Sequence, residues 1–460
     1  MKQHWSGMWE RLLAVRHRGA FTQDVTYMMG GKAITMVVGL VLTPILSRIY
    51  AQETFGTFGL LNSMAIIGAS VAGLRLSDAF ILPRSERGFT SLVRVTAWSC
   101  VVLFLLFTAC LLIFQRPLFS MLNMDLPWTT ALLIPLFILL YAAEDIQVNW
   151  VRRLKAFRQV SMVDPLGQFS SRVFAIGMGL AMPSHWWLFL KEAVRVLVNT
   201  ILRWRWILSP HVTWSHFKPP RRREVRTVLR RYWRLPVFRV PTALVGTFTN
   251  ALPAYMVAAF YDATAVGDLT MAATLLTFPL FLFANTMDSV FQQKAAELRD
   301  RGTVELMRGT LQLYTLLLLL GSLVFGVVYW YGDQLFSVFL GGQWERSGRL
   351  AMALAPWYLS RMINAPVVGL RLVLDKQHWD LAYTVLSGLF IAGCLAVTNP
   401  LGRGLEFDIF WMSMVNALLM LISSIASLTS AGIRPVVALL VTVAMVGLGA
   451  LLTGLPALFW

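Results

Sequence analysis

Charged side chains lie inside the long apolar stretches of this sequence, and they are the residues best placed to do chemistry. The six cations are Lys32, Arg75, Arg172, Lys191, Arg195 and Arg361, and the four acids well inside the same stretches are Asp78, Glu144, Asp145 and Glu192. Arginine binds phosphate in bidentate fashion and lysine binds it as a point charge. We therefore take the six cations as candidate substrate-binding residues for an anionic headgroup such as a diphosphate. The four acids are candidates for tuning those cations or for carrying coupled protons.

Local ion pairs offer a structural alternative for some of these charges. Arg75 and Asp78 are three residues apart, as are Glu192 and Arg195, so each pair would share one face of a helix. Three cations have no acid at that spacing, which leaves ligand contact or pairing between helices: Lys32, Arg172 and Arg361. With a rise of about 1.5 Å per helical residue, Arg75 would lie about 13 Å from the cytoplasmic edge.

The elements that must position these charges are membrane-spanning helices. Of the 460 residues, 57% are hydrophobic and 14% are charged, whereas soluble domains carry about 25% charged residues, which argues against a soluble enzyme. Apolar runs long enough to cross a bilayer recur along the whole chain. Thirteen spans are favoured over twelve, at about 24–47, 56–82, 95–115, 128–151, 159–182, 185–202, 240–261, 269–293, 309–331, 350–370, 378–398, 409–429 and 435–455.

The distribution of basic residues predicts the orientation of these spans. With the N-terminus in the cytoplasm, cytoplasmic segments hold 29 of the 40 Lys and Arg residues and the outer loops hold five. This excess follows the positive-inside rule. It also accounts for the net charge of +17 without a nucleic-acid partner. Thirteen spans place the C-terminus in the periplasm.

The longest polar stretch, 203–239, divides the chain into two halves that resemble each other weakly. It holds eleven Lys and Arg residues and one acid, Glu224, and predicts a basic cytoplasmic linker that contacts lipid headgroups or docks a partner. Tyr50 to Gly56 and Tyr261 to Gly267 have the same spacing near the ends of the first and seventh spans. Both halves begin in the cytoplasm, so the repeat would be parallel. Such halves typically rock around a central cavity.

The expected fold class is therefore all-α, a polytopic transmembrane helical bundle. Two six-helix lobes in a parallel pseudo-two-fold repeat would surround the cavity, followed by an extra C-terminal helix. The predicted boundaries are 1–23 for the cytoplasmic N-terminus, 24–202 for the N-lobe, 203–239 for the linker, 240–429 for the C-lobe and 430–460 for the extra helix.

Motifs for catalysis or metal binding do not occur in the sequence. There is no GxxxxGK[ST], HExxH or CxxC pattern, and the three cysteines lie in apolar runs. Outer loops are short, whereas a periplasmic polymerase or ligase would normally carry its chemistry on a large one. We expect no catalytic residue, no metal site and no cofactor. Coupling of transport to an H⁺ or Na⁺ gradient stays open.

Five stretches of the sequence resemble a known family. They are GGKAITMVVGLVLTPILSRIYAQETFGTFGLL from Gly30, LRLSDAFILPR from Leu74, NWVRRLKAFRQ from Asn149, the apolar 250–298 and LGGQWERSG from Leu340. In order and spacing they are similar to the bacterial Wzx-like polysaccharide biosynthesis flippases. This family is part of the multidrug/oligosaccharidyl-lipid/polysaccharide exporter (MOP) superfamily, which also contains the MATE transporters. The resemblance covers about 24–380.

The resemblance implies a function for the chain. The implied cargo is an oligosaccharide linked to undecaprenyl diphosphate, flipped from the cytoplasmic to the periplasmic leaflet of the bacterial inner membrane for O-antigen, capsule or exopolysaccharide synthesis. Membrane lipids and the polysaccharide polymerase machinery are the implied partners. The alternatives are a drug/cation antiporter of the same superfamily, a membrane glycan polymerase or ligase, and a lipid II flippase.

Overall fold

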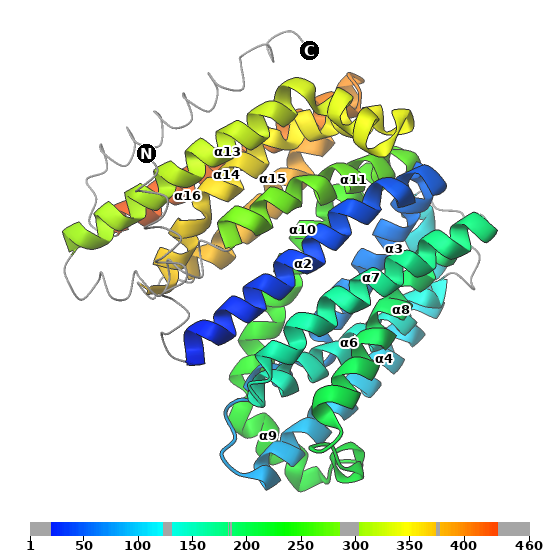
Figure 1. Cartoon of the computed structure of the whole chain (residues 1–460), viewed down its shortest axis with the longest axis vertical. Helices are drawn as coiled ribbons and strands as arrows, with labels where there is room; N and C mark the ends of the chain where they lie inside the picture. The colour runs from blue at the N-terminus through cyan, green and yellow to red at the C-terminus, as the bar shows by residue number, and fades with distance from the viewer. Residues whose placement is uncertain are drawn as a thin grey trace, which may run out of the picture. The chain divides into compact units, whose positions relative to one another are not determined.

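Long helices make up the computed structural model of the chain, which describes residues 20–122, 131–182, 184, 186–285, 303–373 and 378–430 (Figure 1). The first half contributes α2 (Ala20–Ile49), α3 (Gln52–Ala72), α4 (Glu86–Met121), α6 (Leu133–Arg153), α7 (Phe157–Ala181) and α8 (Trp186–Arg203). After α9 (Arg222–Tyr232), the second half contributes α10 (Val240–Phe260), α11 (Ala263–Pro279), α13 (Thr303–Leu340), α14 (Glu345–Val373), α15 (His378–Thr398) and α16 (Leu405–Ser430).

Each of the first twelve predicted spans overlaps one of these helices, although 56–82 runs past the end of α3 and 269–293 runs past the end of α11. Parts of 128–151 and 269–293, and all of the thirteenth span, 435–455, lie outside the described residues. Within the described part of the chain, nine helices are long and apolar enough to cross a membrane. The helices α7, α8 and α14 are not among the nine. All three carry candidate site charges, which lower their hydropathy: Arg172 in α7, Lys191, Glu192 and Arg195 in α8, and Arg361 in α14. The chain is a multi-pass, all-α membrane protein.

Contacts divide the chain into two compact units, which we describe separately. The first comprises 1–46, 68–109 and 135–240, and the second comprises 47–67, 110–134 and 241–460. In the second unit, α14 packs between α13 and α16, and α15 packs against α16 (Figure 1). These are groupings by contact, and the lobe boundaries at 24–202 and 240–429 stay a prediction.

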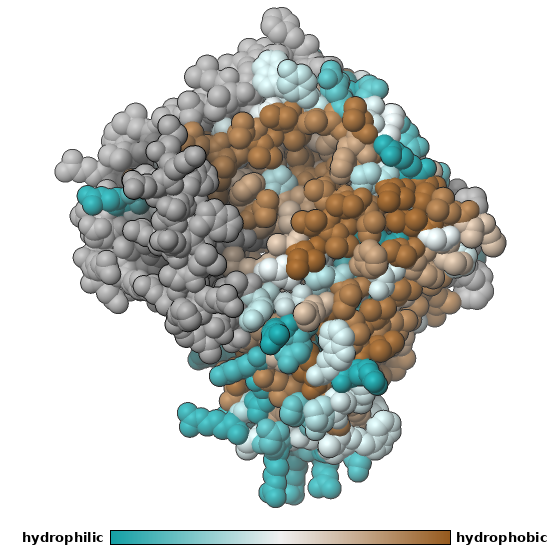
Figure 2. Space-filling view, in the orientation of Figure 1, coloured by the Kyte–Doolittle hydropathy of each residue, from teal (hydrophilic) through white to brown (hydrophobic). Residues whose placement is uncertain are grey.

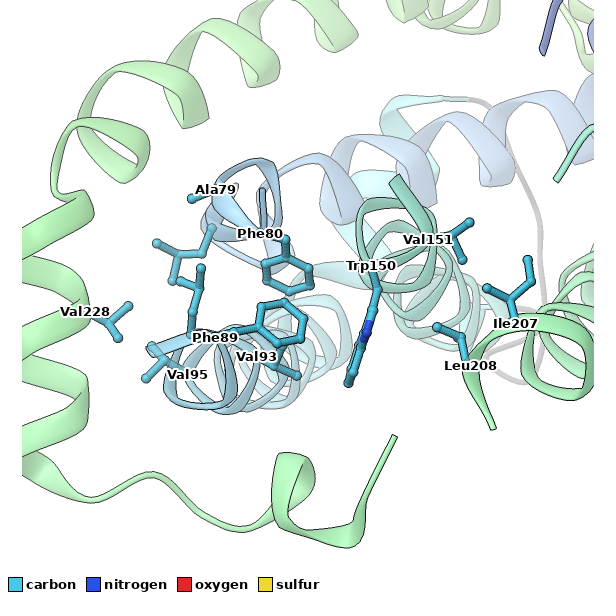
Figure 3. Packing of buried hydrophobic residues seen from close by; sticks show 12 residues of the cluster. Ala79, Phe80, Phe89, Val93, Val95, Trp150, Val151, Ile207, Leu208 and Val228 are labelled. Carbon is cyan, nitrogen blue, oxygen red and sulfur yellow. The ribbon is translucent and has the colours of Figure 1, made fainter. Parts of the chain in front are cut away.

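A core of buried apolar side chains organises one end of the first unit (Figure 3). Phe89 of α4 stands edge-on to Phe80 and to Trp150 of α6, with ring centroids 5.5 and 5.1 Å apart. Ile207 and Val228 pack into the same core from the segment that follows α8. The aromatic pairs add about 0.5–1.5 kcal/mol each beyond the burial of their area. One core therefore joins α4, α6 and the segment around Phe80 to the basic stretch of the chain.

The second unit contains a reciprocal contact between α3 and α11. A Cβ atom added to Gly56 would meet the carbonyl oxygen of Ala263 at 1.9 Å, and one added to Gly267 would meet that of Gln52 at 2.0 Å. In both cases the partner is the first residue of a helix and the glycine lies four residues further along. Only glycine lets the two backbones approach this closely. The equal spacing noted in the sequence thus corresponds to a two-fold-like contact.

The residues that precede these helices are also equivalent in spacing. Tyr50 and Tyr261 each lie between two helices, and burial raises the pKa of each phenol to about 12. In Tyr261, the hydrogen bond that Oη donates to Asp408 Oδ2 at 2.6 Å is the second contribution to this raised pKa, after burial. Both phenols therefore stay protonated at neutral pH, and Tyr261 is a permanent donor to Asp408.

Gly56→Ala and Gly267→Ala are expected to destabilise the protein by similar amounts, about 1–3 kcal/mol each, because backbone must move to admit the methyl group. Gly177→Ala in α7 and Gly246→Ala in α10 are matched controls, since a Cβ there meets nothing within 4 Å. These controls should be neutral or slightly stabilising. Thermal unfolding of the four variants in detergent measures the difference. Unchanged midpoints for Gly56→Ala and Gly267→Ala would contradict the close contact.

Candidate functional site

The second membrane helix is broken where the sequence predicts a continuous span. The span expected over 56–82 ends as an α-helix at Ala72, and a short 3₁₀ helix, η2 (Leu76–Ala79), follows a turn. Leu74 and Arg75 have φ angles of 51° and 54°, in the left-handed region. Such a conformation costs about 1–2 kcal/mol for each non-glycine residue and persists only where the surroundings enforce it. The helical depth calculated for Arg75 is therefore wrong.

Polar side chains of α6 face this break. Arg75 Nε lies 3.4 Å from Asp78 Oδ2, and both side chains are about one-third exposed, at 33% and 28%. Ser77 Oγ donates to Asp145 Oδ2 at 2.5 Å, and Asn149 Nδ2 donates to Asp145 Oδ1 at 3.2 Å. The pair predicted at three-residue spacing thus exists, but across a turn instead of along an α-helix. We call Arg75, Ser77, Asp78, Asp145 and Asn149 the helix-break cluster.

Arg153 holds the chain immediately after the break. Its guanidinium donates to the carbonyl oxygens of Phe80 at 2.9 Å and Pro83 at 2.8 Å. The same group lies 4.3 Å from the centroid of the Phe89 ring, a cation–π contact. Carbonyl groups that a continuous helix would have used are therefore satisfied by one side chain of α6.

Glu144, next to Asp145 on α6, lies at the centre of a second group of charges. Arg195 donates from both terminal nitrogens to the two carboxylate oxygens, each at 3.1 Å. Asn199 and Arg203 also donate to Oε1, each at 3.1 Å. Bidentate, charge-assisted contacts of this kind are among the strongest hydrogen bonds in proteins. Glu144 therefore joins α6 to two turns of α8.

The same network extends to α7 and along α8. Arg203 donates to Asp164 Oδ1 at 2.7 Å, and Arg195 Nε donates to Glu192 Oε2 at 2.8 Å. Lys191 is buried, with its Nζ 4.0 Å from Glu192 Oε1. The Glu144 network, as we use the term, comprises Glu144, Asp164, Lys191, Glu192, Arg195, Asn199 and Arg203.

Arg172 of α7 satisfies backbone of α2. Its Nη1 donates to the carbonyl oxygen of Gly39 at 2.9 Å and to Thr43 Oγ1 at 2.7 Å. Pro44, inside α2, removes one N–H from the helical ladder in the same turn. Arg172 is thus engaged between helices, which is one of the two outcomes its lack of a local acid left open. A contact of Arg172 with substrate stays a prediction.

Lys32 and Arg361 form no ion pair within the described part of the chain. Lys32 is exposed on α2. The Arg361 guanidinium lies 5.7 Å from the Trp357 ring centroid and 5.4 Å from that of Tyr358, one turn earlier on α14. An aromatic platform orients a guanidinium without neutralising its charge. A contact of either side chain with an anionic ligand stays a prediction.

Two buried charged residues were missed by the sequence analysis. Arg203 is 1% exposed, yet it was assigned to the linker because it begins the basic stretch. Arg203 lies four residues after Asn199 and eight after Arg195, so all three share one helix face. This spacing could have identified Arg203 as part of the charged group on α8. Asp268 was placed just before the span 269–293, but α11 begins at Ala263, so Asp268 lies within the helix and accepts bonds from Gln52 at 2.8 Å and Ser347 at 2.6 Å.

Comparison with known proteins assigns the chain to a family. A family model described as polysaccharide biosynthesis protein matches residues 45–349, more than half of the chain. The chain belongs to this family of polysaccharide biosynthesis proteins. The resemblance predicted from the sequence is confirmed at this level. No curated protein matches the chain.

Solved structures share the fold of this polysaccharide biosynthesis protein. The lipid II flippase MurJ in an inward closed conformation has a TM-score of 0.68 at 10% identity, over 92% of this chain and 96% of that one. An inward-facing MATE multidrug resistance transporter of the MOP superfamily has a TM-score of 0.59 at 11% identity, over 90% and 95%. A MOP superfamily transporter from Pyrococcus furiosus Vc1 (DSM3638) has 0.53 at 11% identity, over 89% and 95%. The likeness shows the MOP-type all-α fold, as predicted. The names of these proteins describe a flippase and transporters.

Proposed function

We propose that the chain is an inner-membrane flippase that moves an oligosaccharide linked to undecaprenyl diphosphate from the cytoplasmic to the periplasmic leaflet. The observation that carries this proposal is Arg75, a partly exposed guanidinium at a strained break in a membrane helix of a polysaccharide biosynthesis protein. Broken helices and charges inside the membrane are typical of substrate sites in transporters. A diphosphate matches the bidentate geometry of arginine.

Lys32 and Arg361 support the same proposal, because each keeps a positive charge without a carboxylate partner in the described residues. Arg172, Arg195 and Lys191 are assigned a secondary role, since their polar atoms already contact protein groups. Alternating access would present these cations to the two leaflets in turn. Asp78 and Asp145, beside Arg75, are the acids best placed to couple transport to an H⁺ or Na⁺ gradient.

The location of lipid-linked glycan in a deletion strain tests this function. We expect the intermediate to accumulate and to stay inaccessible to a membrane-impermeant, sugar-specific lectin added to spheroplasts. Total lipid-linked glycan, quantified in parallel, controls for a failure of synthesis. Normal lectin accessibility of the intermediate at the outer face would contradict the proposed function.

Other outcomes of the same deletion identify the alternatives. Normal glycan exposure with increased drug sensitivity would favour a drug/cation antiporter. Single repeat units that reach the outer leaflet but stay unpolymerised would favour a polymerase or ligase. Loss of viability would point to lipid II, the cargo named for one structural neighbour.

A further inference from the structure

The segment between α8 and α10 is folded and rests on the first unit. Residues 204–239, which we call the basic platform, contain a π-helical segment (Trp204–Leu208), a 3₁₀ turn (Trp214–Phe217), α9, and a second π-helical segment (Leu235–Arg239). Ten Lys and Arg residues stand here against one acid, Glu224. This density of like charge would repel itself unless anions were close by.

Three side chains of α4 fasten the platform. Arg94 Nε donates to the Ser215 carbonyl oxygen at 2.6 Å, and its Nη1 pairs with Glu224 Oε1 at 3.0 Å. Trp98 Nε1 donates to the Phe217 carbonyl oxygen at 3.3 Å. Thr90 Oγ1 lies 3.3 Å from Nε2 of the buried His216. Glu224, the single acid of the platform, is thus paired with Arg94 of α4.

The two faces of α9 differ sharply. Val225, Val228, Leu229 and Tyr232 recur at helical spacing and pack into the core shown in Figure 3. At 100° per residue, the opposite face carries Arg223, Arg226, Arg230 and Arg231. All four arginines are exposed. The helix therefore presents a fixed arginine surface whose other side is anchored in the protein.

Large aromatic side chains of the basic platform are also exposed. Trp214 is 82% exposed, and Trp204, Trp206 and Trp233 are each between 44% and 49% exposed. In Figure 2, hydrophilic side chains gather at the lower end of the view, where Figure 1 draws α9. Exposed tryptophan next to arginine is typical of the membrane–water interface, where indole rings lie among lipid headgroups.

We propose that the basic platform binds the anionic phospholipid headgroups of the adjacent leaflet. It is bounded by α8, which ends at Arg203, and by α10, which begins at Val240, so both of its ends enter membrane helices. This tether holds the arginines within a few residues of the bilayer surface, where each basic side chain gains about 1 kcal/mol from anionic lipid. The two flanking membrane helices would hold the platform against a lipid surface but not against a soluble polyanion.

Lipid binding would also bear on the helix break. Leu74, Leu76 and Phe80, on both sides of Arg75, pack into the same core as Val228 of α9. Headgroups that hold α9 in place would therefore stabilise the core against which the residues of the helix break pack. The proposal goes beyond the proposed function, because it requires neither a particular cargo nor transport itself.

Hydrogen–deuterium exchange of the full-length protein in nanodiscs tests the proposal. We compare phosphatidylcholine alone with phosphatidylcholine and phosphatidylglycerol in equal parts. Amide exchange over 214–232 should slow by roughly fivefold or more in the anionic discs, the gain expected from one basic contact. High salt should remove much of this difference, because exposed charges are screened.

Two double variants with the same loss of charge make the test specific. Arg226→Gln/Arg230→Gln should abolish the effect of phosphatidylglycerol. Arg116→Gln/Arg403→Gln, two exposed arginines in the predicted outer loops, should retain it. Equal thermal midpoints show that both double variants are folded, since all four residues are exposed.

Three results would overturn the proposal. The first is equal exchange over 214–232 in the two kinds of disc. The second is equal loss of the lipid effect in both double variants, which would mean that net charge alone is responsible. The third is protection of α9 by added RNA or an acidic peptide in phosphatidylcholine discs without any protection by phosphatidylglycerol. None of these results depends on whether the chain flips a glycan.

Discussion

Glu144→Ala is expected to destabilise the protein by about 3–5 kcal/mol, enough to remove most of the folded material. The substitution deletes a carboxylate that accepts four hydrogen bonds from α8 and leaves Arg195 and Arg203 each short of a partner. Breaking a buried ion pair from one side carries a penalty of this size, and here each of two guanidiniums keeps a single carboxylate, Glu192 for Arg195 and Asp164 for Arg203. Size-exclusion profiles and unfolding midpoints in detergent measure the loss.

Glu86→Ala is the matched control for this prediction. Glu86 also pairs with an arginine, Arg153, at 3.3 Å, but its side chain is 82% exposed. Exposed pairs contribute about 0–1 kcal/mol, so this variant should unfold close to the wild-type midpoint. Glu144→Gln keeps an acceptor oxygen without the charge and should lie between the two. If Glu144→Ala were as stable as Glu86→Ala, the network would not be structural, and Glu144 would be free to serve transport.

Arg75→Ala is expected to reduce glycan export by on the order of tenfold to a hundredfold while folded protein stays at its normal level. A charge-assisted hydrogen bond to a diphosphate contributes about 1.5–3 kcal/mol, which corresponds to that range. The fold should survive, because the only ion pair of Arg75 in the described structure is the partly exposed one with Asp78. Lectin accessibility in a complemented deletion strain measures export, and membrane immunoblots measure the amount of protein.

Two further substitutions at Arg75 separate charge from backbone strain. Arg75→Lys keeps the charge and should retain part of the export. Arg75→Gly removes the charge but adopts a φ of 54° at little cost, so it should raise the unfolding midpoint while export is lost. Arg84→Ala, at an exposed basic residue close in sequence, controls for a general loss of positive charge. Normal export by Arg75→Ala at normal protein levels would contradict the role of Arg75.

Helix positions were predictable from this sequence because apolar run length depends on local composition. The break after Ala72 was not predictable from the sequence, because the run over 56–82 keeps its apolar character and contains no proline. What ends the helix is tertiary: Asp145 binds Ser77, and Arg153 binds the carbonyl oxygens of Phe80 and Pro83. These contacts join residues about 70 positions apart, which no window along the sequence detects.

Among the site residues, contacts within one helix could be predicted from the sequence, and contacts between helices could not. Pairs three residues apart, such as Arg75 with Asp78 and Glu192 with Arg195, were predictable because helical geometry fixes their distance. The link from Arg195 to Glu144 was not, since it depends on how α6 packs against α8. Candidate charges could therefore be found from the sequence, whereas the distinction between structural and available charges required the packing of helices.

The reciprocal contact between Gly56 and Gly267 has a consequence for the history of the gene. Each glycine faces the first residue of the helix that carries the other glycine, which is the geometry of an isologous interface between two copies of one protein. A half-length ancestor could have formed that interface as a homodimer, with one glycine codon serving both sides. After duplication and fusion, the two copies of the sequence would be free to diverge, except at the two glycines where the backbones still touch. Two half-genes expressed separately should accordingly reassemble through this contact.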